Sequence, residues 1–254
     1  MKMQSLQPHV SISGYVSSII VLEDDNLYTD CMIPLVAKGQ PSIVFYTTNK
    51  REGLVLYGQN IKPFEFVASG HLTMIAYFLY PHILKTFFGF NANEVTDLSI
   101  DLSLMQPAKD TNLKEKLINE PTLNGRLQLL NNYILKLSEF TGTVVNKAIL
   151  FATTTIQKNS GLVSLKNIQE ELNVTERTFQ RLFEAHVGVS PKTFCKVCQF
   201  QPAFQQINEG QFSRLGDIAY QNGYADQSHL IRAFREFTNC SPTEYIKLSA
   251  EFRS

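Results

Sequence analysis

The C-terminal part of the chain contains one helical pattern twice, and this duplication constrains the fold more than any other feature. The first copy occupies residues 164–191 and the second residues 214–242. Each copy predicts a short amphipathic helix, a tight turn, a capped second helix and a Ser-Pro stop. That order is typical of two helix-turn-helix units, and a chain with two such units is suited to lie across DNA.

Size and composition fit a globular protein with two domains. The chain has 254 residues, of which 44% are hydrophobic, so each half can bury a core. No run approaches the ~18 apolar residues of a membrane span, and the N-terminus lacks the apolar segment of a secretion signal. Four cysteines are too few for a disulfide scaffold and fit a reducing cytosol. We therefore expect a cytoplasmic protein that does not contact a membrane.

The net charge of the whole chain is zero, which gives no direct support for nucleic-acid binding. Residues 1–140 carry a net charge of −2, and residues 141–254 carry +2. If the C-terminal half binds DNA, it does so through local placement of Arg and Lys rather than through a strongly basic field.

The N-terminal half contains short β-branched and aromatic runs that end at turn residues. We expect strands at residues 15–22, 42–46, 54–57, 64–67 and 74–80, the fourth ending at Ser69-Gly70. This spacing favours an antiparallel barrel or sandwich, followed by a short helix at 83–88. Its aromatic residues either line an apolar pocket, with Ser69 and His71 as polar groups, or simply form the β core, which we favour. They are Phe45, Tyr46, Tyr57, Phe64, Phe66, Tyr77 and Phe78.

From Asn112 the apolar period becomes helical, and Pro121 separates two helical stretches. A further helix is expected at about 144–159. We place the domain boundary between Ser138 and Thr143, with a β-rich domain and its C-terminal helices in residues 1–140. Residues 141–254 form an all-α domain of two helix-turn-helix units joined by a linker helix, so the fold class is α+β.

In the first unit, Ser164 and Thr175 are the expected N-caps of the two helices. The outward positions of the second helix include Arg177, Gln180 and Arg181. Arg is the commonest reader of guanine in the major groove, and Gln can pair with adenine through two hydrogen bonds. We predict base contacts for these side chains; the alternative is an ordinary solvated helix face.

In the second unit, Gly223 lies where the chain reverses, and Asp226 is the expected N-cap of the second helix. The outward residues near the start of that helix are predicted DNA contacts, and a later arginine is a predicted phosphate contact. His229 has no second His or Cys at ligand spacing, so we expect no metal there. The predicted base-contacting residues are Gln227, Ser228, His229 and Arg232, and the phosphate contact is Arg235.

A linker helix is expected from Pro191 to about Asn208. At ~1.5 Å per residue it spans ~27 Å, which suits two recognition helices about one DNA turn, ~34 Å, apart. Pro202 falls inside this helix and should bend or split it. Cys195 and Cys198 form a single Cys-x-x-Cys pair, which is weak evidence for a metal or redox site.

These residues together resemble the DNA-binding domain of the AraC/XylS family of bacterial transcription regulators. The resemblance implies a sequence-specific regulator whose partners are double-stranded DNA and RNA polymerase. Matching positions in that family point toward the groove at Arg177, Gln180, Arg181, Ser228, His229 and Arg232. The resemblance is carried by Ile168, Leu172, Thr175, Arg177, Phe179, Arg181, Phe183, residues 188–191, Phe194, 217–219, 223–224, 228–230, Arg232, Phe234, Ser241, Pro242 and Tyr245.

The chain departs from the family pattern at the linker helix, where Gln199 replaces a usual Arg and Pro202 follows. This departure bears on the rigidity of the linker and on one structural ion pair or phosphate contact, but it does not remove either recognition helix. Family members often carry an N-terminal cupin-like domain that binds an effector or pairs subunits. The resemblance therefore implies a small-molecule effector or a homodimer.

An enzyme is the competing hypothesis, either alone or as a DNA-repair protein fused to a helix-turn-helix module. Against it, the sequence has no Gly-rich phosphate loop, paired-carboxylate signature or Gly-x-Ser-x-Gly motif. In the repair version a reactive cysteine acts on DNA, and Cys31 is the only candidate in the N-terminal half. Nothing around Cys31 suggests a lowered thiol pKa. We expect no catalytic residue, cofactor or metal.

Overall fold

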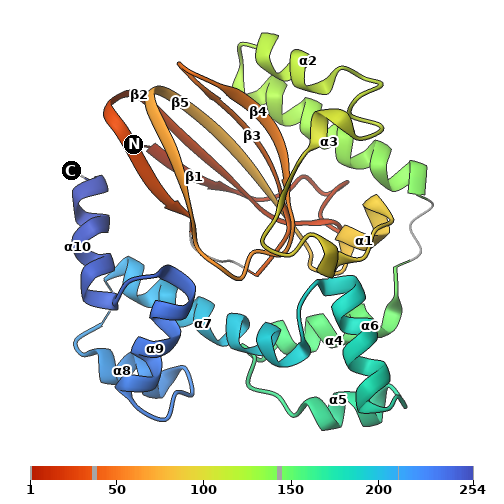
Figure 1. Cartoon of the computed structure of the whole chain (residues 1–254), viewed down its shortest axis with the longest axis vertical. Coiled ribbons are helices and arrows are strands. Elements are labelled where there is room, and N and C mark those ends of the chain that lie inside the picture. The colour runs from red at the N-terminus through yellow and green to blue at the C-terminus, as the bar shows by residue number, and fades with distance from the viewer. Residues whose placement is uncertain (1, 36–38, 142–144, 211, 254) are drawn as a thin grey trace.

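A computed structural model describes residues 2–35, 39–141, 145–210 and 212–253 of the chain. An antiparallel sheet with flanking helices is followed by an all-helical region (Figure 1). This order confirms the α+β class predicted from the sequence. The predicted domain boundary and the predicted start of a helix at Val144 reach into residues 142–144, which lie outside the described residues. The division into residues 1–140 and 141–254 therefore stays a prediction.

Six strands form one antiparallel sheet in the order β1-β2-β5-β3-β4-β6. The central strands alternate between two buried faces, because successive side chains of a strand point to opposite sides of the sheet. The two edge strands were not predicted, since each is short and has few buried residues. The strands are β1 (Lys2–Leu6), β2 (Val16–Leu35), β3 (Ser42–Thr48), β4 (Glu52–Tyr57), β5 (Phe64–Leu79) and β6 (Ser99–Asp101).

The predicted break at Ser69-Gly70 is wrong, because β5 runs through it without interruption. Gly70 takes a positive φ of 71° and stays paired with Leu27 of β2. The pairing register shifts on both sides of Leu27, which indicates an irregular, bulged segment. Glycine permits this conformation inside a strand, so a residue that predicts a turn instead allows two long strands to remain paired. For the same reason β2 extends well past the predicted end at residue 22.

The two faces of the sheet belong to different hydrophobic clusters. Phe45 and Tyr77 are fully buried on the face that packs against helices. Tyr46, Phe66 and Phe78 belong to the cluster on the opposite face. The predicted aromatic set is therefore divided by the sheet and cannot line one pocket. The alternative, a β core, is confirmed for Phe45 and Tyr77.

The polar groups suggested for that pocket are also elsewhere. His71 is exposed, and its Nδ1 lies 3.2 Å from Asp25 Oδ1 while its Nε2 lies 3.1 Å from Thr73 Oγ1. His71 is therefore a surface residue of the sheet.

Among the remaining aromatic residues, Tyr57 stacks on Phe64 with ring centroids 5.0 Å apart.

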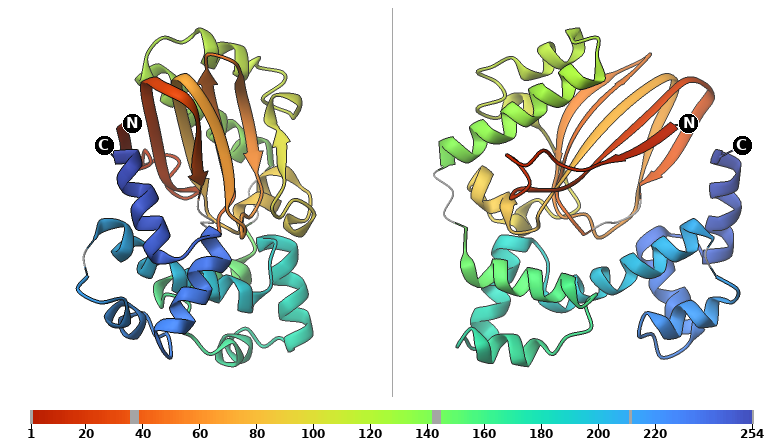
Figure 2. Two further views of the ribbon diagram at one scale, coloured as in Figure 1. Left: turned by 60° about the vertical axis from the view of Figure 1, so that its left-hand side comes forward. Right: turned by 180° about the vertical axis from the view of Figure 1, so that it is seen from behind.

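Three helices, α1 (Ile83–Phe88), α2 (Leu113–Asn119) and α3 (Leu123–Thr141), cover one face of the sheet (Figures 1 and 2). The helix at 83–88 and the pair separated by Pro121 are confirmed. Leu117 of α2 and Ile134 of α3 are buried against the sheet. The Tyr77 hydroxyl donates to Asn131 Oδ1 over 2.8 Å, which ties β5 to α3. Two short 3-10 turns, η1 (Ala92–Glu94) and η2 (Leu102–Leu104), flank β6.

Seven helices of the described residues follow, and they form two hydrophobic clusters. The linker helix α7 continues through Pro202, so the proline does not split it. No helix of the described residues has the length and apolar content needed to cross a bilayer. The helices are α4 (Lys147–Lys158), α5 (Leu165–Glu171), α6 (Glu176–Val187), α7 (Pro191–Glu209), α8 (Leu215–Gln221), α9 (Gln227–Thr238) and α10 (Pro242–Arg253).

Candidate nucleic-acid interface

The first helix-turn-helix unit consists of α5 and α6, and both predicted N-caps are present. Ser164 Oγ accepts from the backbone N–H of Asn167, and Thr175 Oγ1 accepts from that of Thr178, each over 3.3 Å. These bonds satisfy amide groups that have no partner within the helix. Phe183 of α6 is fully buried, so the opposite side of α6 faces outward.

The outward side of α6 carries the three predicted readers. Arg177, Gln180 and Arg181 are all exposed. The Gln180 amide donates to Glu184 Oε1 over 3.0 Å, so it must exchange this bond before it can pair with a base. Arg177 and Arg181 lie four residues apart and therefore occupy the same side of the helix.

The second unit consists of α8 and α9. Its recognition helix α9 has a side-chain N-cap as α6 does, whereas α8 begins at Arg214 without one. Gly223 has a φ of 71° at the turn, and Asp226 Oδ1 accepts from the backbone N–H of His229 over 2.7 Å. The His229 ring meets Tyr224 edge-on, with centroids 5.2 Å apart. All five predicted DNA contacts of this unit are exposed, namely Gln227, Ser228, His229, Arg232 and Arg235.

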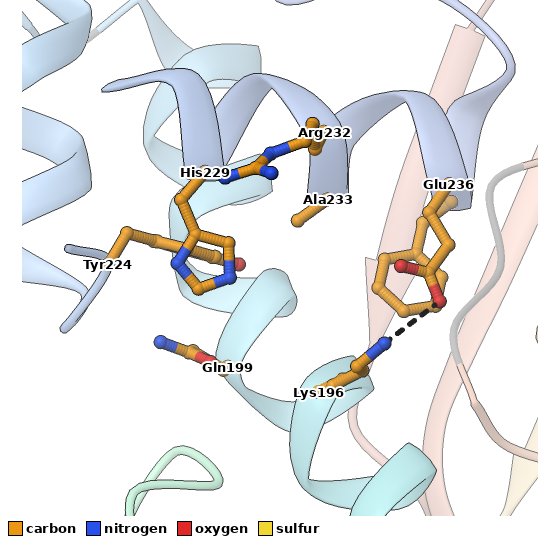
Figure 3. Close-up of a pocket in the computed structure, with 8 residues that line it drawn as sticks. Lys196, Gln199, Tyr224, His229, Arg232, Ala233 and Glu236 are labelled. Atoms are coloured by element: carbon orange, nitrogen blue, oxygen red, sulfur yellow. Dashed lines mark ion pairs between the residues drawn. The ribbon is translucent and has the colours of Figure 1, made fainter. Parts of the chain in front are cut away.

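A groove of about 290 Å³ lies between α7 and α9 and joins these exposed residues to the linker helix (Figure 3). His229 and Arg232 line it from α9, and Lys196 lines it from α7. Lys196 Nζ lies 3.5 Å from Glu236 Oε1, and both side chains are about half exposed. The sequence analysis missed Lys196, because the helical pattern did not distinguish it from any exposed lysine.

Tyr224 lies in the wall of this groove, and its side chain is buried. Among the described residues its hydroxyl has no hydrogen-bond partner. Burial, and then the nearby Glu236 carboxylate, raises the pKa of Tyr224 well above its ordinary value. The phenol is therefore neutral at physiological pH.

The two recognition helices contact the same linker helix, α6 near its start and α9 from its middle onward (Figures 1 and 2). Phe194, near the start of α7, packs on Phe183 of α6 with ring centroids 5.6 Å apart. Phe200, further along α7, packs on Phe234 of α9 at 5.5 Å. The expected spacing of one DNA turn between the two reading faces stays a prediction.

The paired cysteines of α7 are poor nucleophiles. Burial raises the pKa of Cys195 to about 11 and that of Cys198 to about 12, with Cys195 adding to the latter. Both thiols therefore stay protonated at neutral pH, and both pack beside the core of the first unit. Within the described residues no three His, Cys, Asp or Glu side chains are grouped as metal ligands. The side chain of Cys31 lies outside the described residues.

Two family models match separate parts of the chain. Residues 168–248 match a model described as a helix-turn-helix domain, and residues 4–101 match a domain of unknown function, DUF6597. The first match begins in α5 and includes both recognition helices. The chain carries a helix-turn-helix domain of the AraC type. The family resemblance drawn from the sequence is thus confirmed.

The chain also has a curated relative and solved structures with a similar fold. An uncharacterized HTH-type transcriptional regulator from Haemophilus influenzae is 26% identical over 114 residues, covering 41% of this chain and 38% of that protein. ToxT from Vibrio cholerae has a TM-score of 0.47 and 13% identity, over 97% of this chain and 98% of ToxT. The C-terminal domain of AraT, a response regulator from Geobacillus stearothermophilus, has a TM-score of 0.38 and 21% identity, over 42% and 88% of the two chains. The chain thus matches less than half of the length of its curated relative.

Proposed function

We propose that this protein is a DNA-binding transcription regulator that reads two adjacent major-groove segments with α6 and α9. The observation that carries the proposal is the repeated local geometry of the two units. Each recognition helix has a side-chain N-cap, a buried aromatic face and an exposed arginine in its first two turns. Such helices insert their N-terminal halves into the major groove.

The proposed base readers are Arg177, Gln180 and Arg181 from α6, and Gln227, Ser228, His229 and Arg232 from α9. Arg235 is the proposed phosphate contact. Lys196 joins them as a second proposed phosphate contact, because it lines the groove beside His229 and Arg232. The Lys196–Glu236 ion pair is half exposed, so breaking it costs little free energy, and Lys196 can then bind a DNA phosphate instead of Glu236.

Selection of duplexes from a random library by the full-length protein tests this function. We expect recovery of a two-part motif. The affinity should fall steeply with added salt, because Lys and Arg side chains of the protein displace counterions from the DNA phosphates. A protein that recovers no motif and binds no duplex at low salt would refute the proposal.

The N-terminal region is the proposed site of control, either by pairing two copies or by binding a small molecule. DNA binding by α6 and α9 does not itself need the sheet and its helices, which supports a separate role for them. A groove of about 410 Å³ between α2 and α3, lined by Leu129 and Tyr133 among others, is available for either role. Light scattering and a thermal-shift screen of metabolites test the two versions, and a monomer that no compound stabilises would count against both.

As a regulator, the protein would act on RNA polymerase bound beside its DNA site, and it would work in the cytoplasm as a non-enzyme. The competing repair function needs a reactive thiol, and the raised pKa values of Cys195 and Cys198 oppose it for those two cysteines. The rate of alkylation of Cys31 in the native protein separates the two functions. A repair protein needs a reactive Cys31, whereas a regulator needs only DNA binding by its helical region.

A further inference from the structure

Three segments far apart in the sequence meet where the two helix-turn-helix units join. They are the loop before α5, one turn of α7, and the turn between α8 and α9. We infer that this junction, defined as Gly161, Leu162, Gln199, Asn222 and Gly223, holds the units at one separation, so that the protein accepts only one spacing between its two DNA segments. The inference rests on the proposed function and assigns specificity to residues that do not touch DNA.

The first contact joins the loop of unit one to the linker helix. A side-chain carbon at Gly161 would lie 2.0 Å from the Cys195 carbonyl oxygen and 3.1 Å from the Gln199 backbone nitrogen. Gly161 also has a φ of 74°, a conformation that other residues rarely adopt. The loop backbone therefore lies directly against the backbone of α7.

The second contact joins the two units without passing through the linker. The Leu162 side chain covers Gly223, where an added side-chain carbon would lie 2.8 Å from Leu162 Cδ1. Leu162 is 54% exposed, so the contact with Gly223 covers only part of its side chain. A residue of the first unit thus rests on the turn that orients α9.

The third contact is a chain of hydrogen bonds from α7 into the turn of unit two. Gln199 Nε2 donates to the Asn222 carbonyl oxygen over 3.0 Å. The Asn222 amide nitrogen donates to Gln206 Oε1 over 2.9 Å and to the Ile218 carbonyl oxygen over 2.8 Å. Asn222 is buried, so these bonds replace its contacts with water and specify one position of the turn relative to α7.

This network accounts for the departure from the family pattern at Gln199. The side chain is the right length to reach a neutral carbonyl group of the second unit, and it lines the groove beside His229. A positional lock of this kind matters on DNA because inserting one base pair shifts a half-site by ~3.4 Å and rotates it by ~35°. A rigid pair of reading helices cannot follow that change, whereas a flexible pair can.

The test uses the full-length protein and the duplex recovered by selection. The spacing between its two half-sites is left unchanged, or is lengthened or shortened by one or two base pairs. The variants are Gln199→Leu, Leu162→Ala and their combination, and Gln221→Ala is the matched control because it is exposed and adjacent to Asn222. We expect wild type and Gln221→Ala to lose roughly tenfold or more in affinity per base-pair change, as a lost base contact does. The combined variant should lose less than about threefold between spacings.

A second readout measures the lock without DNA. Nitroxides are placed by non-canonical amino acids at exposed Lys166 of α5 and Tyr220 of α8, and their distance distribution is recorded. We expect a narrow distribution in the otherwise unchanged chain and a broader one in the combined variant at an unchanged melting temperature. Equal widths, or equal spacing dependence, would overturn the lock. If the distance distribution broadens in the combined variant but the protein binds no duplex, the proposed function is refuted and the lock is supported.

Discussion

The two helix-turn-helix units share their order of elements but differ in what surrounds them. In the first, α6 packs against the N-terminal region through α1 and η1, and the Thr96 hydroxyl donates to the Gly188 carbonyl oxygen over 2.7 Å. In the second, α9 packs on α7, α8 and α10. The first unit is thus placed to respond to the N-terminal region, and the second to follow the linker helix.

The difference extends to the chemistry of the two surroundings. At the first unit the half-buried His186 lies near the buried His82 and near Lys85, so that basic groups gather where the N-terminal region meets α6. At the second unit five aromatic rings form a connected cluster within the core, namely Phe200, Phe204, Phe234, Phe237 and Tyr245. Polar contacts can be altered by pH or ligand, whereas a closed aromatic core resists both. The comparison suggests one adjustable unit and one rigid unit.

The largest effect is expected in the aromatic core. Phe234→Ala removes a fully buried ring that contacts Phe200, Phe204 and Tyr245, and should lower the free energy of unfolding by roughly 3–5 kcal/mol. Tyr220→Ala, on the 85% exposed Tyr220 of α8, should change it by less than about 0.5 kcal/mol. Urea denaturation measures both. Similar losses in the two variants would show that the second unit has no rigid core.

The next largest effect is a loss of folding stability on acidification, at the contact between the N-terminal region and the first unit. Burial, and then the neighbouring His186, lowers the pKa of His82 to about 4 from its ordinary 6.5. Between these values the unfolded chain binds a proton at this residue that the folded chain does not, so the contribution of His82 to stability is constant above about pH 6.5 and falls as the pH drops toward 4. The loss should total roughly 3 kcal/mol.

His82→Phe keeps a ring beside Tyr80 and removes the titrating group, so it should flatten this acid-induced loss. Urea midpoints at pH 7 and pH 4.5 measure the difference, and His9→Phe in an exposed turn is the control. If His82→Phe and wild type lose the same stability on acidification, the contact between α1 and α6 is not the pH-sensitive part of the molecule.

A smaller effect separates residues that read bases from those that position the backbone. Arg181→Ala and Arg232→Ala should each cost roughly 1–3 kcal/mol on the preferred duplex and relax preference at different base pairs. Those positions should lie about one DNA turn apart. Arg235→Ala should weaken all sequences about equally, as loss of a phosphate contact does. Binding to a randomised library measures all three, and an unchanged motif in the first two variants would show that the recognition assignment is wrong.

The smallest effect tests whether the first unit depends on the N-terminal region. Thr96→Val removes the hydroxyl that bonds to Gly188 but keeps the shape of the side chain, and should cost roughly 1 kcal/mol of stability. Thr111→Val, which removes a hydroxyl bonded to Pro107 away from α6, is the matched control. We expect only Thr96→Val to speed hydrogen exchange in α6. Equal exchange in α6 and α9 would remove the distinction between the units.

Local features of the fold could be predicted because their causes are local. The caps at Ser164, Thr175 and Asp226 depend on a side chain and an amide group two or three residues away. The exposed faces of α6 and α9 follow from the helical period alone. Gly223 at the turn was predicted in the same way, since the need for a positive φ is a property of one residue. The family resemblance was carried by these same residues.

The remaining features depend on contacts between residues that are distant in the chain. The sequence suggested a strand end at Gly70, but pairing with Leu27 across the sheet decided that β5 continues. Sequence spacing could not show which hydrophobic cluster each face of the sheet joins, with Phe45 in one and Tyr46 in the other. Their neighbours come from helices and strands that only the folded chain brings near.

The sequence by itself determined the two helix-turn-helix units and their outward residues, because capping and periodicity act within one helix. Only the tertiary structure decided how the units are held together. Gln199 meets Asn222 across 23 positions of sequence, and Thr96 meets Gly188 across 92. No propensity or spacing predicts such pairs, since each forms only after the helices have packed and set the distance between donor and acceptor.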